Sequence, residues 1–313
     1  MKRCSLLDQV EDYVAYRRGL GFGLEGQHQM LLDFVRHTES VGHQGPMTTE
    51  LAVQWALSSS STDRSYAAQR LSAVRHFARH LALSDPETEI PPVGLLEGSA
   101  SRKPPHIYSD TEIAALLHEA SLLHPHGGLC PRTYVTCFSL LAATGLRVSE
   151  ACGLASHDVD LAQGLITVRE SKFRKSRLVP LHSTTTEALT QYQTDCGPSL
   201  RGSFFRTDRA GTLKTKAVQA TFRRLRDQLG WTQDGRTRRP RIHDLRHTFA
   251  VRCLLRFYEE GADIDRKILA LATYLGHVKV SYTYWYFSAV PELMAISSQR
   301  FEHYARTVQE DSP

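Results

Sequence analysis

The sequence predicts a mainly α-helical protein with a small antiparallel β-sheet, an α+β fold divided between two domains. Apolar residues recur at helical spacing along most of the 313 residues, and only one pair of short segments has the composition of strands. A proline- and glycine-rich stretch interrupts the helical pattern after residue 90. We therefore expect a helical domain over residues 1–90, a linker over 91–107 and a second domain over 108–313.

Four amphipathic helices are predicted in the first domain. Ser5 and Asp8 resemble a capping box that opens the first helix, which runs to about Gly19. The other three helices begin, in order, near Gln27, at Thr48 or Thr49, and at Thr62–Asp63. Four such helices with short connections predict a small bundle.

The second domain is predicted to begin with a helix and to contain one hairpin. Ser109 and Glu112 have the spacing of a capping box before an apolar stripe. The hairpin pairs residues 165–168 with 178–181 across a polar turn at 170–177. Helical patterns follow the hairpin and continue to the end of the chain.

Composition limits the class of protein. The chain has 41% hydrophobic and 23% charged residues, and no apolar run approaches the roughly 20 residues that a membrane helix needs. Its six cysteines are scattered singly, as is typical of free thiols in a reducing compartment. The N-terminus does not have the pattern of a secretory leader. We expect a cytoplasmic protein.

Positive charge is concentrated in the second domain. Residues 1–107 contain 11 Lys and Arg against 12 Asp and Glu, whereas residues 108–313 contain 27 against 21. The densest part is the arginine-rich stretch 223–246, and such density favours phosphate binding in nucleic acids. A basic run alone is as typical of a solvated surface. The candidate DNA-contacting side chains, from this stretch and from the hairpin turn, are Arg174, Lys175, Arg177, Arg238, Arg239 and Arg241.

An arginine lies where one predicted helix ends and the next begins. Gly145 ends the first helix, and Arg147 follows at once near the start of the second. A guanidinium there can hold two phosphate oxygens, and Glu150, three residues on, can support it. The pair by itself is more typical of a surface salt bridge.

Lys172 lies at the tip of the predicted hairpin among other cations. Cationic neighbours lower the pKa of a lysine, which allows it to protonate a leaving oxygen. A solvated turn is the alternative interpretation of this segment.

His243 and Arg246 are three positions apart, so on a helix they share one face. That face presents an imidazole and a guanidinium together. His247 is one turn from His243, as in a metal-binding pair, but no Glu or Cys at a suitable spacing completes a site. We therefore expect no metal.

Tyr286 follows His277 by nine positions. In one continuous helix nine residues make about 2.5 turns, which would place the two side chains on opposite sides. Joint action requires a break between them, and the β-branched residues of this segment favour one. Tyr282 and Tyr284 are rival nucleophiles, and an aromatic cluster of this kind is more often part of a core.

Together these motifs resemble the tyrosine recombinases, the family of phage integrases, Xer-type resolvases and transposon recombinases. The resemblance covers the whole second domain in family order, and the first domain is similar to the family's SAM-like core-binding domain. It implies these catalytic residues: the arginines Arg147 and Arg246, the lysine Lys172, the histidines His243 and His277, and the nucleophile Tyr286, with Glu150 in support. Ser171 and Phe173 flank Lys172 where many relatives carry glycines, so Lys175 remains an alternative to Lys172.

The resemblance also implies a mechanism. Tyr286 would attack a phosphodiester to give a 3′-phosphotyrosyl link and a free 5′-hydroxyl, with His243 as the candidate base. No cofactor is required, the substrate is double-stranded DNA, and four protomers act together on two recombination sites. We expect a site-specific recombinase carried by a mobile element. The alternatives are an Xer-like role in replicon resolution, a topoisomerase IB-like nicking and rejoining enzyme, and a DNA-binding protein without activity.

Overall fold

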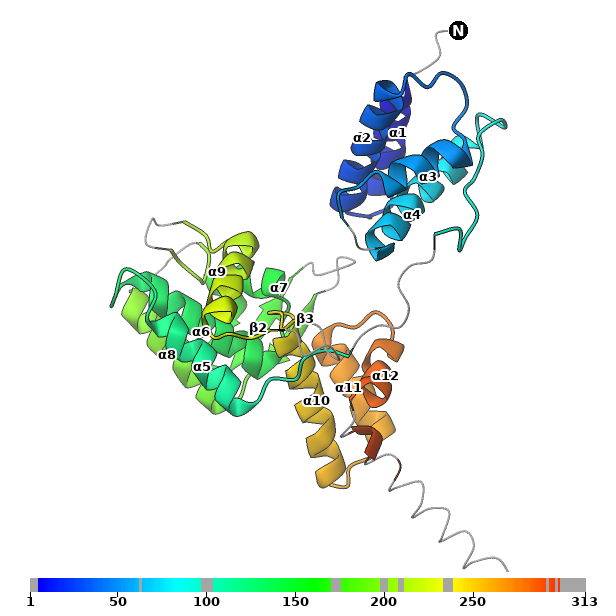
Figure 1. Ribbon diagram of the computed structural model, residues 1–313. Helices are drawn as coiled ribbons and strands as arrows, with labels where there is room; N and C mark the ends of the chain where they lie inside the picture. The colour runs from blue at the N-terminus through cyan, green and yellow to red at the C-terminus, as the bar shows by residue number, and fades with distance from the viewer. Residues whose placement is uncertain are drawn as a thin grey trace, which may run out of the picture. The chain divides into compact units, whose positions relative to one another are not determined.

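The structure is a computed structural model, and it divides the chain into two compact units, residues 1–102 and 103–313 (Figure 1). It describes residues 5–61, 64–96, 104–169, 176–197, 202–207, 211–232, 239–290, 293–295 and 298. Outside these ranges lie the predicted cap Thr62–Asp63 and the predicted site residues Lys172, Arg174, Lys175 and Arg238.

The described residues of the first unit form a bundle of four helices. They are α1 (Leu6–Gly19), α2 (Glu25–Ser40), α3 (Thr49–Leu57) and α4 (Arg64–Leu81). The Ser5 and Asp8 side chains form the expected capping box at the start of α1, and Thr48 caps α3. The apolar faces of all four helices meet in one core around Trp55, Phe34 and Phe77.

The second unit begins with α5 (Asp110–Ser121), which Ser109 and Glu112 cap as predicted. The helices that follow it in the first part of this unit are α6 (Leu129–Thr144), α7 (Val148–Cys152), α8 (Ser183–Cys196) and α9 (Thr215–Gln228), with a 3-10 turn at Ser156–Asp158.

A three-stranded antiparallel sheet lies among these helices. Its strands are β1 (Val159–Asp160), β2 (Leu165–Val168) and β3 (Arg177–Pro180), in that order. In the predicted hairpin, Ile166 pairs with Val179, and both side chains are buried in the core. β1 is an addition to the prediction, because two residues are too short to give an alternating pattern.

After α9, the described part of the second unit contains the helices α10 (Asp244–Glu259), α11 (Ile264–Leu275) and α12 (Ser281–Ala289). They share a core of their own, which includes Leu254, Ile268 and Leu275, and α10 also packs against α6. The mainly α fold with a small antiparallel sheet is therefore confirmed. In the described part of the chain, no helix is both long enough and apolar enough to span a membrane.

Candidate active site

Arg147 is held at the junction between α6 and α7. Gly145 ends α6 in the left-handed region (φ 62°), and Arg147 is the N-cap residue of α7. Its backbone amide donates to Glu150 Oε2 at 2.9 Å, and its guanidinium donates to Glu150 Oε1 at 2.6 Å. A third hydrogen bond, of 3.0 Å, runs from Arg147 to the carbonyl of Gly276. The guanidinium is thus oriented from two sides while 23% of the side chain stays exposed.

Arg177, the first residue of β3, approaches Glu150 from the other side. It donates to Oε1 and Oε2 of Glu150 at 3.0 and 2.8 Å, and to the carbonyl of Tyr274 at 2.7 Å. Only 10% of the Arg177 side chain is exposed. Its guanidinium thus contacts Glu150 and Tyr274, whereas its place at the hairpin turn predicted a contact with DNA. The sequence pattern contained no sign of this pairing.

Glu150 is charged in this environment. Burial alone would raise its pKa, but hydrogen bonds from Arg177 and from the Arg147 backbone, with the charges of both arginines, lower the pKa to about 2. One carboxylate therefore stabilises two guanidinium groups, of which only Arg147 faces solvent appreciably.

Arg246 lies in the first turn of α10 and is almost fully buried, with 3% exposed. It donates to the carbonyl of Gly145 at 2.8 Å and to the carbonyl of Leu275 at 2.6 Å. Burial and then the nearby Arg147 lower its pKa to about 10, so it still carries a charge at neutral pH. Arg147 and Arg246 thus both bind the turn at 275–276 that ends α11.

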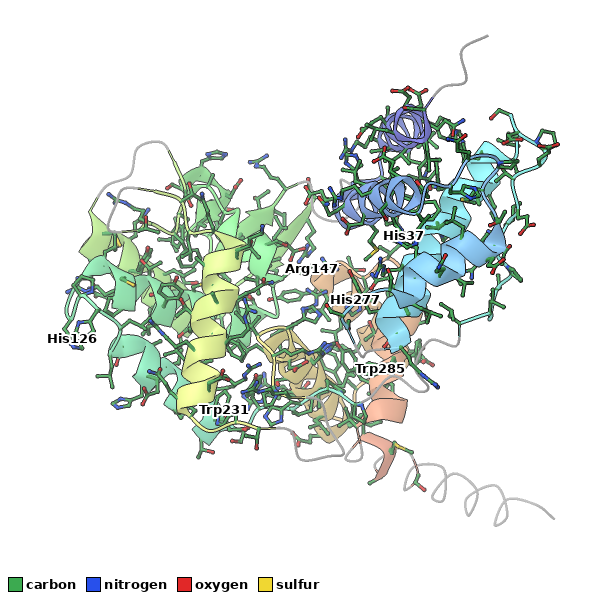
Figure 2. All side chains as sticks on the ribbon, turned by 45° about the horizontal axis from the view of Figure 1, so that its top comes forward. His37, His126, Arg147, Trp231, His277 and Trp285 are labelled. Atoms are coloured by element: carbon green, nitrogen blue, oxygen red, sulfur yellow. The ribbon has the colours of Figure 1, made fainter. Side chains whose placement is uncertain are left out.

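The two predicted histidines lie beside these arginines. His243 is the N-cap residue of α10, and His277 follows the end of α11, in the same part of the second unit as Arg147 (Figure 2). Burial and then the charge of Arg246 lower the pKa of His243 to about 4 and that of His277 to about 3. Both imidazoles are therefore neutral at neutral pH. His277 Nδ1 lies 2.8 Å from Thr283 Oγ1.

The break required between His277 and Tyr286 is present. Gly276 ends α11 in the left-handed region (φ 67°), and α12 starts only at Ser281. Of the β-branched residues that favoured a break, Val278 and Val280 lie before α12, whereas Thr283 lies within it. Tyr286 is on α12, is 1% exposed, and places its hydroxyl 2.7 Å from Nδ1 of His247.

The rival tyrosines have a different environment. Tyr282 and Tyr284 are 49% and 46% exposed, and the Tyr284 hydroxyl donates to Asp265 on α11 at 3.1 Å. The charge of Tyr286 affects the pKa of Arg246, so its phenol lies near that guanidinium.

Sequence comparisons decide the family. The pattern that defines the phage integrase family matches residues 111–292, which is more than half of the chain. The chain belongs to the phage integrase family of tyrosine recombinases. A Sinorhizobium fredii protein, y4rB, described provisionally as an integrase/recombinase, is 39% identical over 94% of this chain and 96% of its own length. The recombinase is therefore an enzyme of DNA strand exchange, as predicted.

Solved structures of integrases have the same fold. The Tn1549 transposon integrase in complex with transposon right end DNA is 16% identical, with a TM-score of 0.68, over 95% of this chain and 99% of that one. A lambda integrase tetramer bound to a Holliday junction is 17% identical, with a TM-score of 0.62, over 88% of this chain and 78% of that one. At these identities the likeness establishes the fold alone.

Two more of the predicted DNA-contacting arginines of the recombinase bind acidic side chains, as Arg177 does. Arg239, which is 48% exposed, donates to Asp227 on α9 at 2.7 Å. Arg241 is 42% exposed and donates through its guanidinium to the buried Asp244 at 2.8 Å. Both keep a large exposed fraction, so a phosphate can still reach them. Among the described residues, no group of three or more His, Cys, Asp or Glu side chains could hold a metal.

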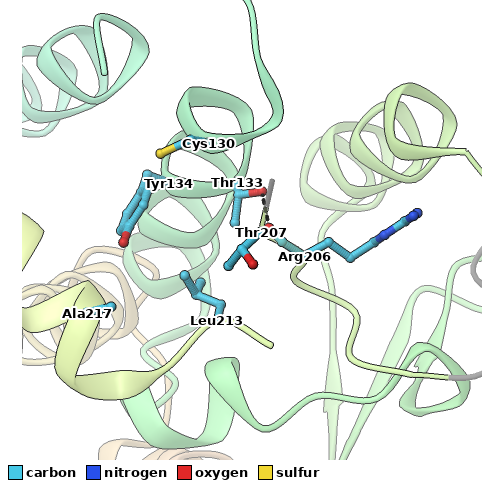
Figure 3. Close-up of a pocket in the computed structure, with 7 residues that line it drawn as sticks. All are labelled: Cys130, Thr133, Tyr134, Arg206, Thr207, Leu213 and Ala217. Carbon is cyan, nitrogen blue, oxygen red and sulfur yellow. Dashed lines mark hydrogen bonds between the residues drawn. The ribbon is translucent and has the colours of Figure 1, made fainter. Parts of the chain in front are cut away.

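A cavity of about 480 Å³ lies between α6 and α9 (Figure 3). Its lining residues are Cys130, Thr133, Tyr134, Arg206, Thr207, Leu213 and Ala217. The Thr133 hydroxyl donates to the carbonyl of Arg206 at 2.8 Å, while the Arg206 guanidinium extends away from the cavity to the carbonyl of Cys196. This cavity shares no residue with the arginine and histidine cluster.

Proposed function

We propose that this recombinase cuts and rejoins DNA strands through a covalent 3′-phosphotyrosyl intermediate on Tyr286. The observation that carries the proposal is the convergence of Arg147, Arg246 and His277 on the turn between α11 and α12, from which α12 brings Tyr286. Groups that are far apart in the sequence thereby meet where one phosphodiester could bind. The same convergence supports a retained activity over a DNA-binding protein without one.

The charges of the site match the chemistry. Attack of the Tyr286 oxygen on phosphorus forms an O–P bond, breaks the bond to the 5′-oxygen, and places negative charge on the non-bridging oxygens. The Arg147 and Arg246 guanidinium groups are already oriented by carbonyl acceptors, so little reorganisation accompanies the stabilisation of that charge. His243 and His277 are neutral at neutral pH and can donate a hydrogen bond to the same oxygens.

The departing 5′-oxygen needs a proton. We assign its donation to Lys172 at the hairpin turn, with Lys175 as the alternative. β3, which follows this turn, carries Arg177 into the Glu150 contact, so the hairpin is tied directly to the arginine cluster. The phosphotyrosyl bond retains the energy of the broken phosphodiester, and attack by a 5′-hydroxyl releases Tyr286. No cofactor is needed for either step.

The substrate is proposed to be double-stranded DNA, bound by both domains and exchanged within a tetramer. Solved structures of related fold contain transposon end DNA and a tetramer on a Holliday junction, which supports this assignment. Within this proposal, residues 1–90 form the core-binding domain and residues 108–313 the catalytic domain. An assay for synapsis of two sites distinguishes the two reactions. Strand exchange requires synapsis, whereas a topoisomerase IB-like reaction takes place on one duplex.

A mobile-element role is the narrower proposal. The similarity to the integrase/recombinase y4rB over nearly the full length of both chains supports it, while Xer-like replicon resolution is the alternative. Excision of a marker flanked by the borders of the encoding element supports the first role. Resolution of plasmid dimers that carry a chromosomal site supports the second.

The nucleophile is tested with nicked duplexes from the borders of the element that encodes the recombinase. Cleavage close to a nick releases a short fragment and traps the covalent complex. We expect the complex with the native chain, with Tyr282→Phe and with Tyr284→Phe, and its loss in Tyr286→Phe. A trapped complex in Tyr286→Phe would disprove the assignment of the nucleophile.

A further inference from the structure

His247 is the side chain in hydrogen-bond contact with the proposed nucleophile. Its Nδ1 lies 2.7 Å from the Tyr286 hydroxyl, and the two rings meet edge to face with centroids 5.5 Å apart. The histidine comes from α10 and the tyrosine from α12, so the contact joins two separate helices. Both residues are buried, with 6% and 1% exposed. A hydrogen bond between two buried groups is electrostatically stronger than the same bond in water.

A buried carboxylate faces the other nitrogen of the same ring. Asp244 is 0% exposed, and its Oδ1 lies 3.9 Å from His247 Nε2. Arg241 holds the carboxylate in place through its backbone amide and its guanidinium, each at 2.8 Å. A carboxylate on this side favours the tautomer with hydrogen on Nε2. Nδ1 then keeps its lone pair and can accept from the phenol.

The arrangement has the order nucleophile, base and carboxylate. A base within hydrogen-bond reach of a weak nucleophile, oriented by a third group, is the general means of activating such a nucleophile. An ordinary tyrosine has a pKa near 10, so activation is required at neutral pH. A cation formed on His247 would lie beside the negative charge of Asp244, which compensates its burial.

Other ionisable groups around His247 come from several elements. The His243 ring lies 4.9 Å from the His247 ring, and Arg246 is the adjacent residue on α10. Other charged or titratable groups near this cluster include Arg147 before α7, Arg241 before α10, and Tyr108 before α5, whose pKa is affected by Asp244. The nearby arginines disfavour a positive charge on His247, whereas Asp244 favours it.

We propose that His247 is the catalytic residue that accepts the proton of Tyr286, with Asp244 as its positioning residue. This inference rests on the proposed function, in which Tyr286 is the nucleophile. The phenolic O–H bond breaks as its proton passes to His247 Nδ1, and the oxygen forms its bond to phosphorus. The bond from phosphorus to the 5′-oxygen breaks, and that oxygen takes a proton from the lysine of the hairpin turn. In rejoining, His247 returns its proton to Tyr286.

This assignment differs from the expectation that His243 is the base. The phenol has its hydrogen-bond contact with His247, one helical turn further along α10. His243 lies at the start of that helix beside both arginines, where its neutral ring suits a contact with a phosphate oxygen. Tyr286 is 1% exposed, so DNA binding must expose its hydroxyl to the phosphate while His247 Nδ1 stays within hydrogen-bond distance of it.

The decisive variant is His247→Asn, with His243→Asn as its matched control. An asparagine oxygen can accept a hydrogen bond near the position of Nδ1, but it cannot carry a proton at neutral pH. The rate of covalent complex formation is measured between pH 7 and 9 on nicked duplexes. A parallel set carries sulfur in place of the scissile 5′-oxygen, because a thiolate leaves without a general acid.

We expect His247→Asn to slow complex formation at pH 7 by about 100-fold or more, and sulfur not to restore the rate. Its rate should rise about tenfold per pH unit, because the reaction then depends on spontaneous ionisation of the phenol. The native chain and His243→Asn should lack this steep rise. DNA binding by gel shift and the melting temperature check that each variant is folded. If His247→Asn is unfolded, His247→Gln takes its place.

Two outcomes overturn the inference while leaving the proposed function intact. One is a rate within a few-fold of native in His247→Asn with an unchanged pH profile, which makes His247 a packing residue. The other is the steep pH profile in His243→Asn alone, which makes His243 the base. A covalent complex in Tyr286→Phe, measured in the same series, would instead reject the proposed function.

Discussion

Glu150 and Arg177 are 27 positions apart in the sequence, and their side chains form a two-point ion pair in the candidate active site. Both carboxylate oxygens accept from the guanidinium, at 3.0 and 2.8 Å, and both side chains are at most 10% exposed. Because Glu150 also holds Arg147, the hairpin strand β3 is connected through one carboxylate to a proposed catalytic arginine. Stability and activity should therefore change together at this position.

Replacing the shared carboxylate tests that connection. Glu150→Gln keeps the side-chain volume but leaves two guanidinium groups without their anion. Loss of one partner of a buried pair costs about 3–5 kcal/mol of unfolding free energy. Asp110→Asn is the control, because Asp110 is 91% exposed in its pair with Arg252 and should cost under about 1 kcal/mol. Chemical denaturation measures the unfolding free energy of both variants. Equal losses in the two would contradict a stabilising role of the buried ion pair.

The low pKa of Glu150 predicts an acid-dependent loss of stability. A carboxyl whose pKa falls from about 4.3 when unfolded to about 2 when folded stabilises the fold above the unfolded value. That contribution, about 3 kcal/mol, disappears as pH falls through the folded value. The stability difference between the native chain and Glu150→Gln should thus be constant from pH 5 to 7 and shrink between about pH 4.5 and 2. A difference independent of pH would exclude the ion pair as its source.

The neutral state of His243 and His277 is accessible to NMR. Their folded pKa values of about 4 and 3 lie below the unfolded value of about 6.5, so folding favours the neutral rings. The stability they contribute is present above pH 6.5 and decreases as pH falls toward 4 and 3. In the protein labelled at its 15 histidines, each ring signal is assigned by its absence from the spectrum of His243→Asn or His277→Asn. The chemical shifts of these two signals should stay constant between pH 8 and 5. Titration of either signal near pH 6.5, as in the unfolded chain, would contradict this.

Gly145 should tolerate no side chain. Its φ of 62° is unfavourable for other residues, and a Cβ there would lie 2.7 Å from Cδ1 of Phe249. Gly230→Ala is matched to Gly145→Ala, because Gly230 has a similar φ of 70° and nothing within 4 Å of its Cβ position. We expect about 1–2 kcal/mol of destabilisation in the control and about 1–3 kcal/mol more at Gly145. Since the Gly145 carbonyl also accepts from Arg246, complex formation should slow only in Gly145→Ala.

Local signals in the sequence predicted local structure well. The capping boxes at Ser5 and Ser109 fix the starts of α1 and α5, because the capping hydrogen bonds involve residues only three apart. The break before Tyr286 was predicted from the nine-residue spacing to His277, although Gly276 is the residue that ends the helix. Helix geometry made that break a condition for the two side chains to act together.

Contacts between distant segments could not be predicted in the same way. Arg177 was predicted to contact DNA from its place at the basic hairpin turn. Its position 97 residues before Tyr274 gave no sign of the hydrogen bond between them. His247 was considered only as half of a metal pair with His243, since periodicity reports the shared helix face and not the helix that packs on it. Tertiary packing decides which polar group a buried side chain meets.

The chemical identity of the DNA adduct tests the central claim most directly. The covalent complex trapped on a nicked duplex is digested with protease and nuclease, and mass spectrometry locates the residue that carries the nucleotide. We predict a single modified peptide with the nucleotide linked through its 3′-phosphate to Tyr286. A nucleotide on Tyr282 or Tyr284, or one linked through a 5′-phosphate, would contradict the account.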